Sequence, residues 1–77
     1  MKYVSVRTHR DLGAVIRQAR KEQGLTLTQV SGLSGIGVRF LSELERGKST
    51  IQLGKALEVI ELLGLKLQVT GLDGDDA

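Results

Sequence analysis

Residues 26–47 decide the fold, and their sequence is TLTQVSGLSGIGVRFLSELERG. Thr26 and Gln29 have the spacing of a capping box, so a helix should begin directly after Thr26. We expect this helix to end near residue 33 or 34, because Gly35 can adopt the positive φ that often ends a helix. A further helix should run from Val38 to about residue 46, where another glycine follows. The stretch therefore predicts two short helices joined by a tight turn that contains glycine.

The residues on either side predict two more helices. Thr8 and Asp11 have the spacing of a second capping box, and apolar residues recur at helical spacing after them as far as a glycine at position 24. A fourth helix is expected over Leu53–Leu63, with Ser49 and Thr50 as candidate caps. Its apolar residues cover more than the single stripe that one core requires. This surplus predicts a second buried surface, and a dimer interface is the simplest explanation.

The two ends of the chain have the alternating pattern of short strands. Residues 65–70, LKLQVT, alternate cleanly between apolar and polar side chains, and residues 3–7, YVSVR, do so weakly. Residues 1–70 are expected to form the domain, and residues 71–77 a flexible acidic tail. The predicted fold is mainly α, with four or five helices, a short C-terminal strand and a second candidate strand at the N-terminus.

Composition narrows the function. A chain of 77 residues forms one domain and buries a smaller fraction of its surface than a larger domain does, so self-association is the expected support. With no cysteine and one histidine, we expect neither disulfides nor a metal or other cofactor. Eleven Lys and Arg residues stand against nine Asp and Glu, three of which lie in the last five residues. The body of the chain is therefore basic, which suits a polyanionic partner.

Two short helices joined by a tight glycine-containing turn are the signature of a helix-turn-helix motif. In DNA-binding proteins the second helix of this motif lies in the major groove. The segments GLTLTQVS (24–31), GIG (35–37) and LSELERGK (41–48) resemble the phage-repressor family, also called Cro/C1 or XRE. The resemblance spans about residues 12–63 and implies a phage-repressor-like fold that binds double-stranded DNA.

Within that family, the continuation from Ser49 through LKLQV (65–69) is most similar to HipB-type antitoxins. The resemblance implies a homodimer whose C-terminal strands pair with each other. It also implies a repressor of its own operon that binds a HipA-type serine/threonine kinase toxin. Two recognition helices about one helical turn apart would bind a palindromic operator.

The start of the second helix of the motif is expected to contact base edges, because this part of a recognition helix points into the groove. The positions expected to be exposed there are Val38, Arg39, Ser42 and Glu43. Arg39 can pair with guanine, Val38 can contact a thymine methyl group, and Glu43 can accept a hydrogen bond from cytosine. The alternatives are a simply solvated Arg39, and a Glu43 that pairs with Arg39 one turn earlier.

Contacts with DNA phosphates are expected at helix starts and in the basic segment after the motif. The candidates are Gln29, Arg46, Lys48, Ser49 and Thr50. The family resemblance also implies an internal salt bridge between Arg20 and Glu45, which would join the first helix to the end of the third. The expected dimer interface consists of Val59, Leu62, Leu65, Leu67 and Val69.

We expect no enzymatic activity, because no nucleophile–base pair, metal cluster or phosphate-binding loop is visible in the sequence. One alternative function is a stand-alone phage or plasmid repressor without a toxin. Another is an adaptor that binds protein in place of DNA, although the basic residues Arg39, Arg46 and Lys48 argue against it. A cytoplasmic location, on the nucleoid when bound to DNA, is expected because no segment resembles a signal peptide or approaches the roughly 20 apolar residues of a membrane span.

Overall fold

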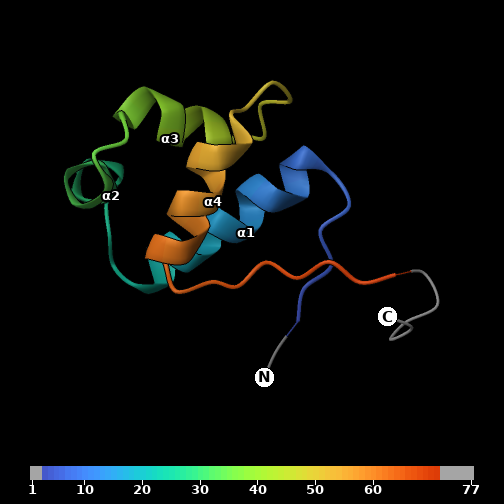
Figure 1. Ribbon diagram of the computed structural model, residues 1–77. Helices are drawn as coiled ribbons and strands as arrows, with labels where there is room; N and C mark the ends of the chain where they lie inside the picture. Colours follow the sequence, from blue (N-terminus) through green and yellow to red (C-terminus); the bar gives the residue numbers. More distant parts are fainter. Residues whose placement is uncertain (1–2, 72–77) are drawn as a thin grey trace.

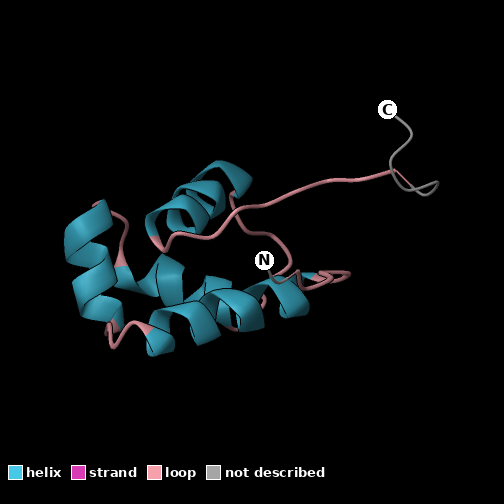
Figure 2. Ribbon diagram, turned by 90° about the horizontal axis from the view of Figure 1, so that it is seen from below, coloured by secondary structure: helices cyan, strands magenta, loops and turns pink. Residues whose placement is uncertain are grey.

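The computed structural model describes residues 3–71, which form four helices around one core (Figures 1 and 2). Helix α1 spans His9–Glu22, α2 spans Leu27–Ser34, α3 spans Val38–Glu45 and α4 spans Leu53–Leu62. The prediction of a mainly helical chain is confirmed. No helix in the described range is long and apolar enough to cross a membrane. The acidic tail predicted for residues 71–77 lies, from residue 72 onward, outside the described residues.

Helices α1 and α2 begin at the two predicted capping boxes. Thr8 Oγ1 accepts a hydrogen bond from the Asp11 amide at 3.0 Å, and Asp11 Oδ2 accepts one from the Thr8 amide at 3.2 Å. Thr26 and Gln29 form the same reciprocal pair at 3.0 and 2.8 Å. Each box pairs backbone N–H groups that a helix start leaves unsatisfied. Both helix starts are therefore determined by residues three positions apart.

The turn between α2 and α3 is held by its glycine and by one serine. Gly35 has a φ of 78° and ends α2, and its amide donates to the Ser31 carbonyl at 2.8 Å. Ser34 Oγ donates to the Val30 carbonyl at 2.8 Å and accepts from the Ile36 amide at 3.0 Å. Ile36 is 6% exposed and belongs to the core. The turn therefore has a fixed direction, which places α3 at a defined angle to α2.

One hydrophobic core joins all four helices. Its buried side chains are Ile16, Ala19, Val30, Ile36, Leu41, Leu44, Ala56, Val59, Ile60 and Leu63. Burial of an aliphatic side chain of this size contributes about 1.5–3 kcal/mol. Val59 is only 1% exposed within one protomer, so its predicted place in a dimer interface is wrong. Part of the apolar surplus of α4 is used by the protomer's own core.

Gly13 allows α1 to pack closely on the end of α3. A Cβ atom at this position would lie 2.5 Å from the Leu44 carbonyl oxygen and 2.6 Å from that of Glu45. Both distances are well below van der Waals contact, and both partners are backbone atoms that cannot rotate away. A glycine inside a helix ordinarily weakens it. Here the glycine is required by the packing of two helices.

The strands predicted at the two ends are not formed within this protomer. Apart from a single bridge residue at Gly71, residues 3–71 contain no β-structure. Residues 65–70 follow α4 as a long loop, which starts against the core at Leu65 and whose far end extends beyond the helices (Figures 1 and 2). A strand is stable only when a neighbouring strand pairs with its backbone. The described part of the protomer does not provide such a neighbour.

Candidate nucleic-acid interface

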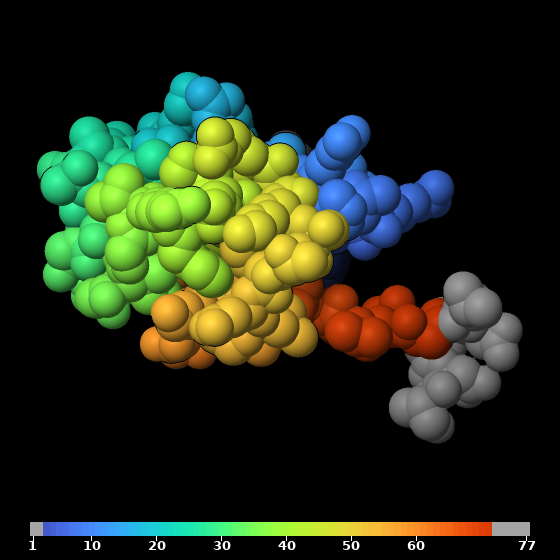
Figure 3. Space-filling view, turned by 90° about the horizontal axis from the view of Figure 1, so that it is seen from above, coloured from blue at the N-terminus to red at the C-terminus, as the bar shows by residue number. Residues whose placement is uncertain are grey.

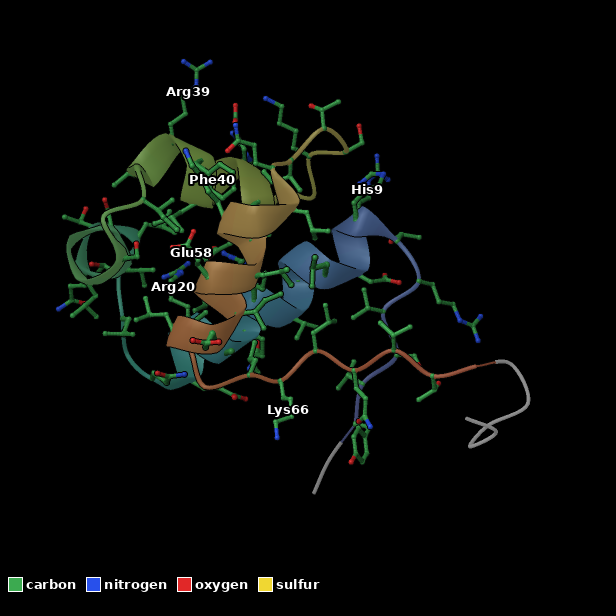
Figure 4. All side chains as sticks on the ribbon, in the orientation of Figure 1. His9, Arg20, Arg39, Phe40, Glu58 and Lys66 are labelled. Atoms are coloured by element: carbon green, nitrogen blue, oxygen red, sulfur yellow. The ribbon has the colours of Figure 1, made fainter. Side chains whose placement is uncertain are left out.

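The outer side of α3 is exposed, whereas its inner side is buried. Val38 is 41% exposed and the Arg39 side chain 91%, whereas Leu41 and Leu44 on the inner side are each 2% exposed. This division follows from the helical repeat, which separates the two sets of residues onto opposite faces. Figure 4 shows Arg39 pointing away from the body of the molecule. Ser42, one turn after Val38, is half-buried. The inner face thus holds α3 in place and leaves its outer face to a partner.

Glu43 lies between two of the predicted DNA-contacting cations. Its Oε1 is 3.3 Å from Lys48 Nζ, and its Oε2 is 3.6 Å from Arg39 Nε. The hydrogen bond from Lys48, together with the positive charges of Lys48 and Arg39, holds the pKa of the Glu43 carboxyl below its usual value. The ion pair with Arg39, which the sequence left as an alternative to base contact, is present in the unbound protein.

Gln29 is exposed at the start of α2, and its capping role leaves part of its side chain available. Its Oε1 accepts the Thr26 amide, and its own backbone amide donates to Thr26 Oγ1. The side-chain Nε2 group takes no part in the box and carries two N–H donors. Gln29 can therefore cap α2 and donate a hydrogen bond to an outside acceptor at the same time.

Four of the predicted phosphate-contacting residues lie at or just after the end of α3. Arg46, Lys48, Ser49 and Thr50 are all exposed. The expectation that Ser49 or Thr50 caps α4 is wrong, because Gln52 is the N-cap residue and makes no side-chain cap bond. Both hydroxyl groups lie outside the α4 cap. Figure 3, which views this face from above, shows the loop of residues 47–52 beside α3 and next to the start of α1.

Arg20 and Glu45 are brought together below this surface. Arg20 Nε and Nη2 donate to the two Glu45 carboxylate oxygens at 2.6 and 2.9 Å, and Arg20 Nη1 donates to the Leu25 carbonyl at 2.7 Å. The two side chains are only 11% and 7% exposed. The hydrogen bond with Glu45 raises the pKa of Arg20. One guanidinium thus connects α1, the segment before α2 and the end of α3.

Two contacts that support α3 had no clear signal in the sequence. Lys55 Nζ lies 5.5 Å from the centre of the Phe40 ring, a cation–π contact between α4 and α3. His9 Nδ1 donates to the Gly47 carbonyl and joins the start of α1 to the end of α3. Each contact joins residues from distant parts of the chain, which local sequence patterns do not reveal. In residues 3–71, no group of His, Asp or Glu side chains is arranged to hold a metal ion.

The predicted dimer residues other than Val59 are at least partly accessible. Leu62 is 39% exposed, Leu67 48% and Val69 89%, whereas Leu65 is half-buried and packs on the core. Leu62 near the end of α4, and Leu67 and Val69 in the segment that follows, are therefore exposed apolar side chains of the C-terminal part of the protomer. We refer to Leu62, Leu67 and Val69 as the C-terminal apolar surface.

Comparison with known proteins identifies relatives over most of the chain. A family model described as helix-turn-helix matches residues 16–69. Over 64 residues the chain is 42% identical to the uncharacterized HTH-type transcriptional regulator y4mF of Sinorhizobium fredii. This match covers 83% of the chain and 84% of y4mF. The chain is 34% identical over 65 residues to the transcriptional regulator ClgR of Mycobacterium tuberculosis, and this match covers 84% of the chain and 58% of ClgR.

Solved structures of HipB have the same fold. The HipB chain of the HipB–O4 20mer complex superposes with a TM-score of 0.83 and 16% identity, over 91% of this chain and 99% of the HipB chain. A chain of the HipA–HipB–O2–O3 complex gives the same TM-score, identity and coverage. The expected similarity in fold to HipB is confirmed. The matching family model and the identity with HTH-type regulators show that the chain belongs to the XRE-type helix-turn-helix family.

Proposed function

We propose that this protein is a sequence-specific DNA-binding transcriptional repressor that acts as a homodimer. The observation that carries the proposal is the outer face of α3, where Arg39 is 91% exposed while the inner face is locked in the core. A helix held in this way can enter the major groove without rearrangement. Arg39 then pairs with guanine, Val38 contacts a thymine methyl group, and Ser42 and Glu43 contact neighbouring bases.

Phosphate contacts orient α3 in the groove. Gln29 donates from the start of α2, and Arg46, Lys48, Ser49 and Thr50 surround the end of α3. Donors on both sides of a recognition helix fix its register on the duplex, although they carry no sequence information themselves. The relationship to HTH-type transcriptional regulators supports this assignment. The protein would act in the cytoplasm, on the nucleoid when bound to DNA.

We propose that the dimer forms through the C-terminal apolar surface. Residues 65–70 have an alternating sequence but no partner strand within the described protomer. Pairing with the same segment of a second copy would satisfy their backbone groups, and it would cover Leu67 and Val69. Two α3 helices related by twofold symmetry would then bind a palindromic operator.

The finer proposal is that the repressor is the antitoxin of a HipA-type kinase toxin and represses its own operon. The fold shared with HipB supports it, including the chain found in a complex with HipA. Co-expression with the product of the adjacent open reading frame tests it. A stable complex together with relief of growth arrest would support an antitoxin. Absence of both would favour a stand-alone repressor.

DNA binding is tested by a mobility-shift titration with the protein's own promoter fragment and a random fragment of equal length, over a series of salt concentrations. We expect tight promoter binding that weakens steeply with salt. Arg39→Ala should lose about 1–3 kcal/mol of preference for the promoter. Lys21→Gln, which removes one charge near the far end of α1, is the control. If the protein binds neither fragment at low salt, the proposal is overturned. The alternative of an adaptor that binds protein in place of DNA is then favoured.

A further inference from the structure

A shallow basic hollow lies where the first turn of α1 meets the turn that follows α3. Its lining residues are His9, Arg10, Glu43, Arg46, Gly47, Lys48 and Ser49. The sequence indicated three of these as phosphate contacts, but His9 and Arg10 come from the first turn of α1, outside the helix-turn-helix motif. Figure 4 places His9 on the same side of the molecule as Arg39, and Figure 3 shows the start of α1 beside the loop after α3.

The walls of the hollow are held together by two contacts. His9 Nδ1 donates to the Gly47 carbonyl, which directs the other ring nitrogen away from that carbonyl. A Cβ atom at Gly47 would lie 2.7 Å from Arg10 Cα and 2.8 Å from Arg10 Cγ. The φ of Gly47 is also positive, at 81°, a conformation that side chains disfavour. The backbone of Arg10 therefore sits directly on the turn, at a position that does not depend on a flexible loop.

The charge of the hollow is positive. Arg10, Arg46 and Lys48 line it together with one carboxylate, that of Glu43. This carboxylate is already paired with Lys48 at 3.3 Å and with Arg39 at 3.6 Å. Within residues 3–71 the structure shows no ion pair at Arg10 or Arg46. Two guanidinium groups from opposite walls thus face the hollow without an internal counter-ion.

We propose that this hollow binds one backbone phosphate of DNA, which Arg10 and the ring of His9 contact together with Arg46 and Ser49. An open, shallow, polar site of this kind suits a phosphate on a large, exposed strand. It does not suit a small molecule, which requires an enclosed pocket. Planar guanidinium groups match the oxygen geometry of a phosphate. The phosphate would flank the bases contacted by α3, so α1 extends the footprint of each protomer. This inference rests on the proposed DNA binding.

The test compares wild type with Arg10→Gln, Arg10→Lys and the control Lys21→Gln in the same salt titration. Glutamine keeps the Cβ and Cγ atoms that lie against Gly47, and it removes only the charge. We expect Arg10→Gln to weaken binding about 5- to 10-fold per protomer at 0.1 M salt, equally for promoter and random DNA. The slope of log K against log salt should fall by about 1 per protomer. Arg10→Lys should restore most of the slope.

Lys21 lies eleven residues beyond Arg10 on the same helix, about 16 Å along its axis, so Lys21→Gln should keep the wild-type slope. The thermal midpoint of each variant verifies its folding. If wild type binds its promoter and a folded Arg10→Gln variant keeps both affinity and slope, the hollow is not a phosphate site. The proposed function then stands. If wild type itself binds no DNA, the proposed function fails first.

Discussion

At the scale of single residues, Arg20 joins three parts of the chain. Its guanidinium bonds both carboxylate oxygens of Glu45 and the Leu25 carbonyl, and it is 11% exposed. We expect Arg20→Ala to lower the free energy of unfolding by about 3 kcal/mol, because the Glu45 charge would remain largely buried without a partner. Urea denaturation measures this change.

Arg39→Ala is the control for Arg20→Ala, because the Arg39 side chain is 91% exposed and an ion pair at such a position contributes little to stability. Arg20→Ala should thus lower the stability of the fold, whereas Arg39→Ala should lower DNA binding and leave stability nearly unchanged. Equal loss of stability in both variants would contradict the structural role assigned to the buried pair.

The lowered pKa of Glu43 predicts how the stability of the fold changes as the pH falls. A carboxyl whose pKa is lower in the folded than in the unfolded state stabilises the fold above its unfolded pKa. This contribution is lost as the pH falls through the folded pKa. Because Lys48 and Arg39 lower the pKa of Glu43, wild type should be more stable than Glu43→Gln at pH 7. The difference should shrink as the pH falls through the folded pKa of Glu43, as measured in parallel urea titrations. A difference that grows on acidification would show that the sign is wrong.

At the scale of helices, two glycines with opposite surroundings can be compared. A Cβ at Gly13 of α1 would meet the backbone of Leu44 and Glu45, whereas a Cβ at Gly32 of α2 would meet nothing within 4 Å. We expect Gly13→Ala to destabilise the protein by about 1–3 kcal/mol through overpacking. Gly32→Ala should stabilise it by about 0.5–1 kcal/mol through helix propensity. Thermal unfolding of both variants checks the pair. Stabilisation by both would mean that α1 and α3 are less closely packed than described.

Helix starts could be predicted where the signal was local. The capping boxes at Thr8 and Thr26 join residues three positions apart, so their spacing was sufficient. Gly13 gave no such signal, since its constraint comes from backbone atoms more than thirty positions away. Ser49 and Thr50 had the chemistry of caps but lie two or more residues before the actual N-cap, Gln52. Residue type alone does not determine where a helix begins.

At the scale of the whole molecule, the C-terminal apolar surface determines the proposed assembly. Leu67 is 48% exposed in the protomer, so a charge at this position can be tolerated by the isolated fold. We expect Leu67→Asp to convert the dimer to a monomer in sedimentation equilibrium, because an interface core excludes unpaired charge. Leu33→Asp, at a residue of α2 that is 65% exposed, should remain dimeric. A wild-type protein that is already monomeric at high concentration would rule out this dimer.

The assembly was also where the sequence was hardest to interpret. Helix α4 carries more apolar residues than one stripe, and composition does not tell which of them face the protomer's own core. Val59 is buried there, while Leu62 is exposed. The alternation of residues 65–70 indicates a strand, but the backbone that would pair with it is not part of the described protomer. Intermolecular contacts leave a weaker pattern in one chain than intramolecular ones do.

The division of α3 into an anchored face and an exposed face has a consequence for engineering. Leu41, Leu44 and Glu45 hold the helix from inside, and Val38 and Arg39 take no part in that anchoring. Randomising Val38 and Arg39 should therefore give a library in which most members still fold. Selection from that library on altered promoters would yield regulators with new target preferences on an unchanged scaffold. A gene duplicate of this protein could acquire a separate regulatory target by the same few substitutions.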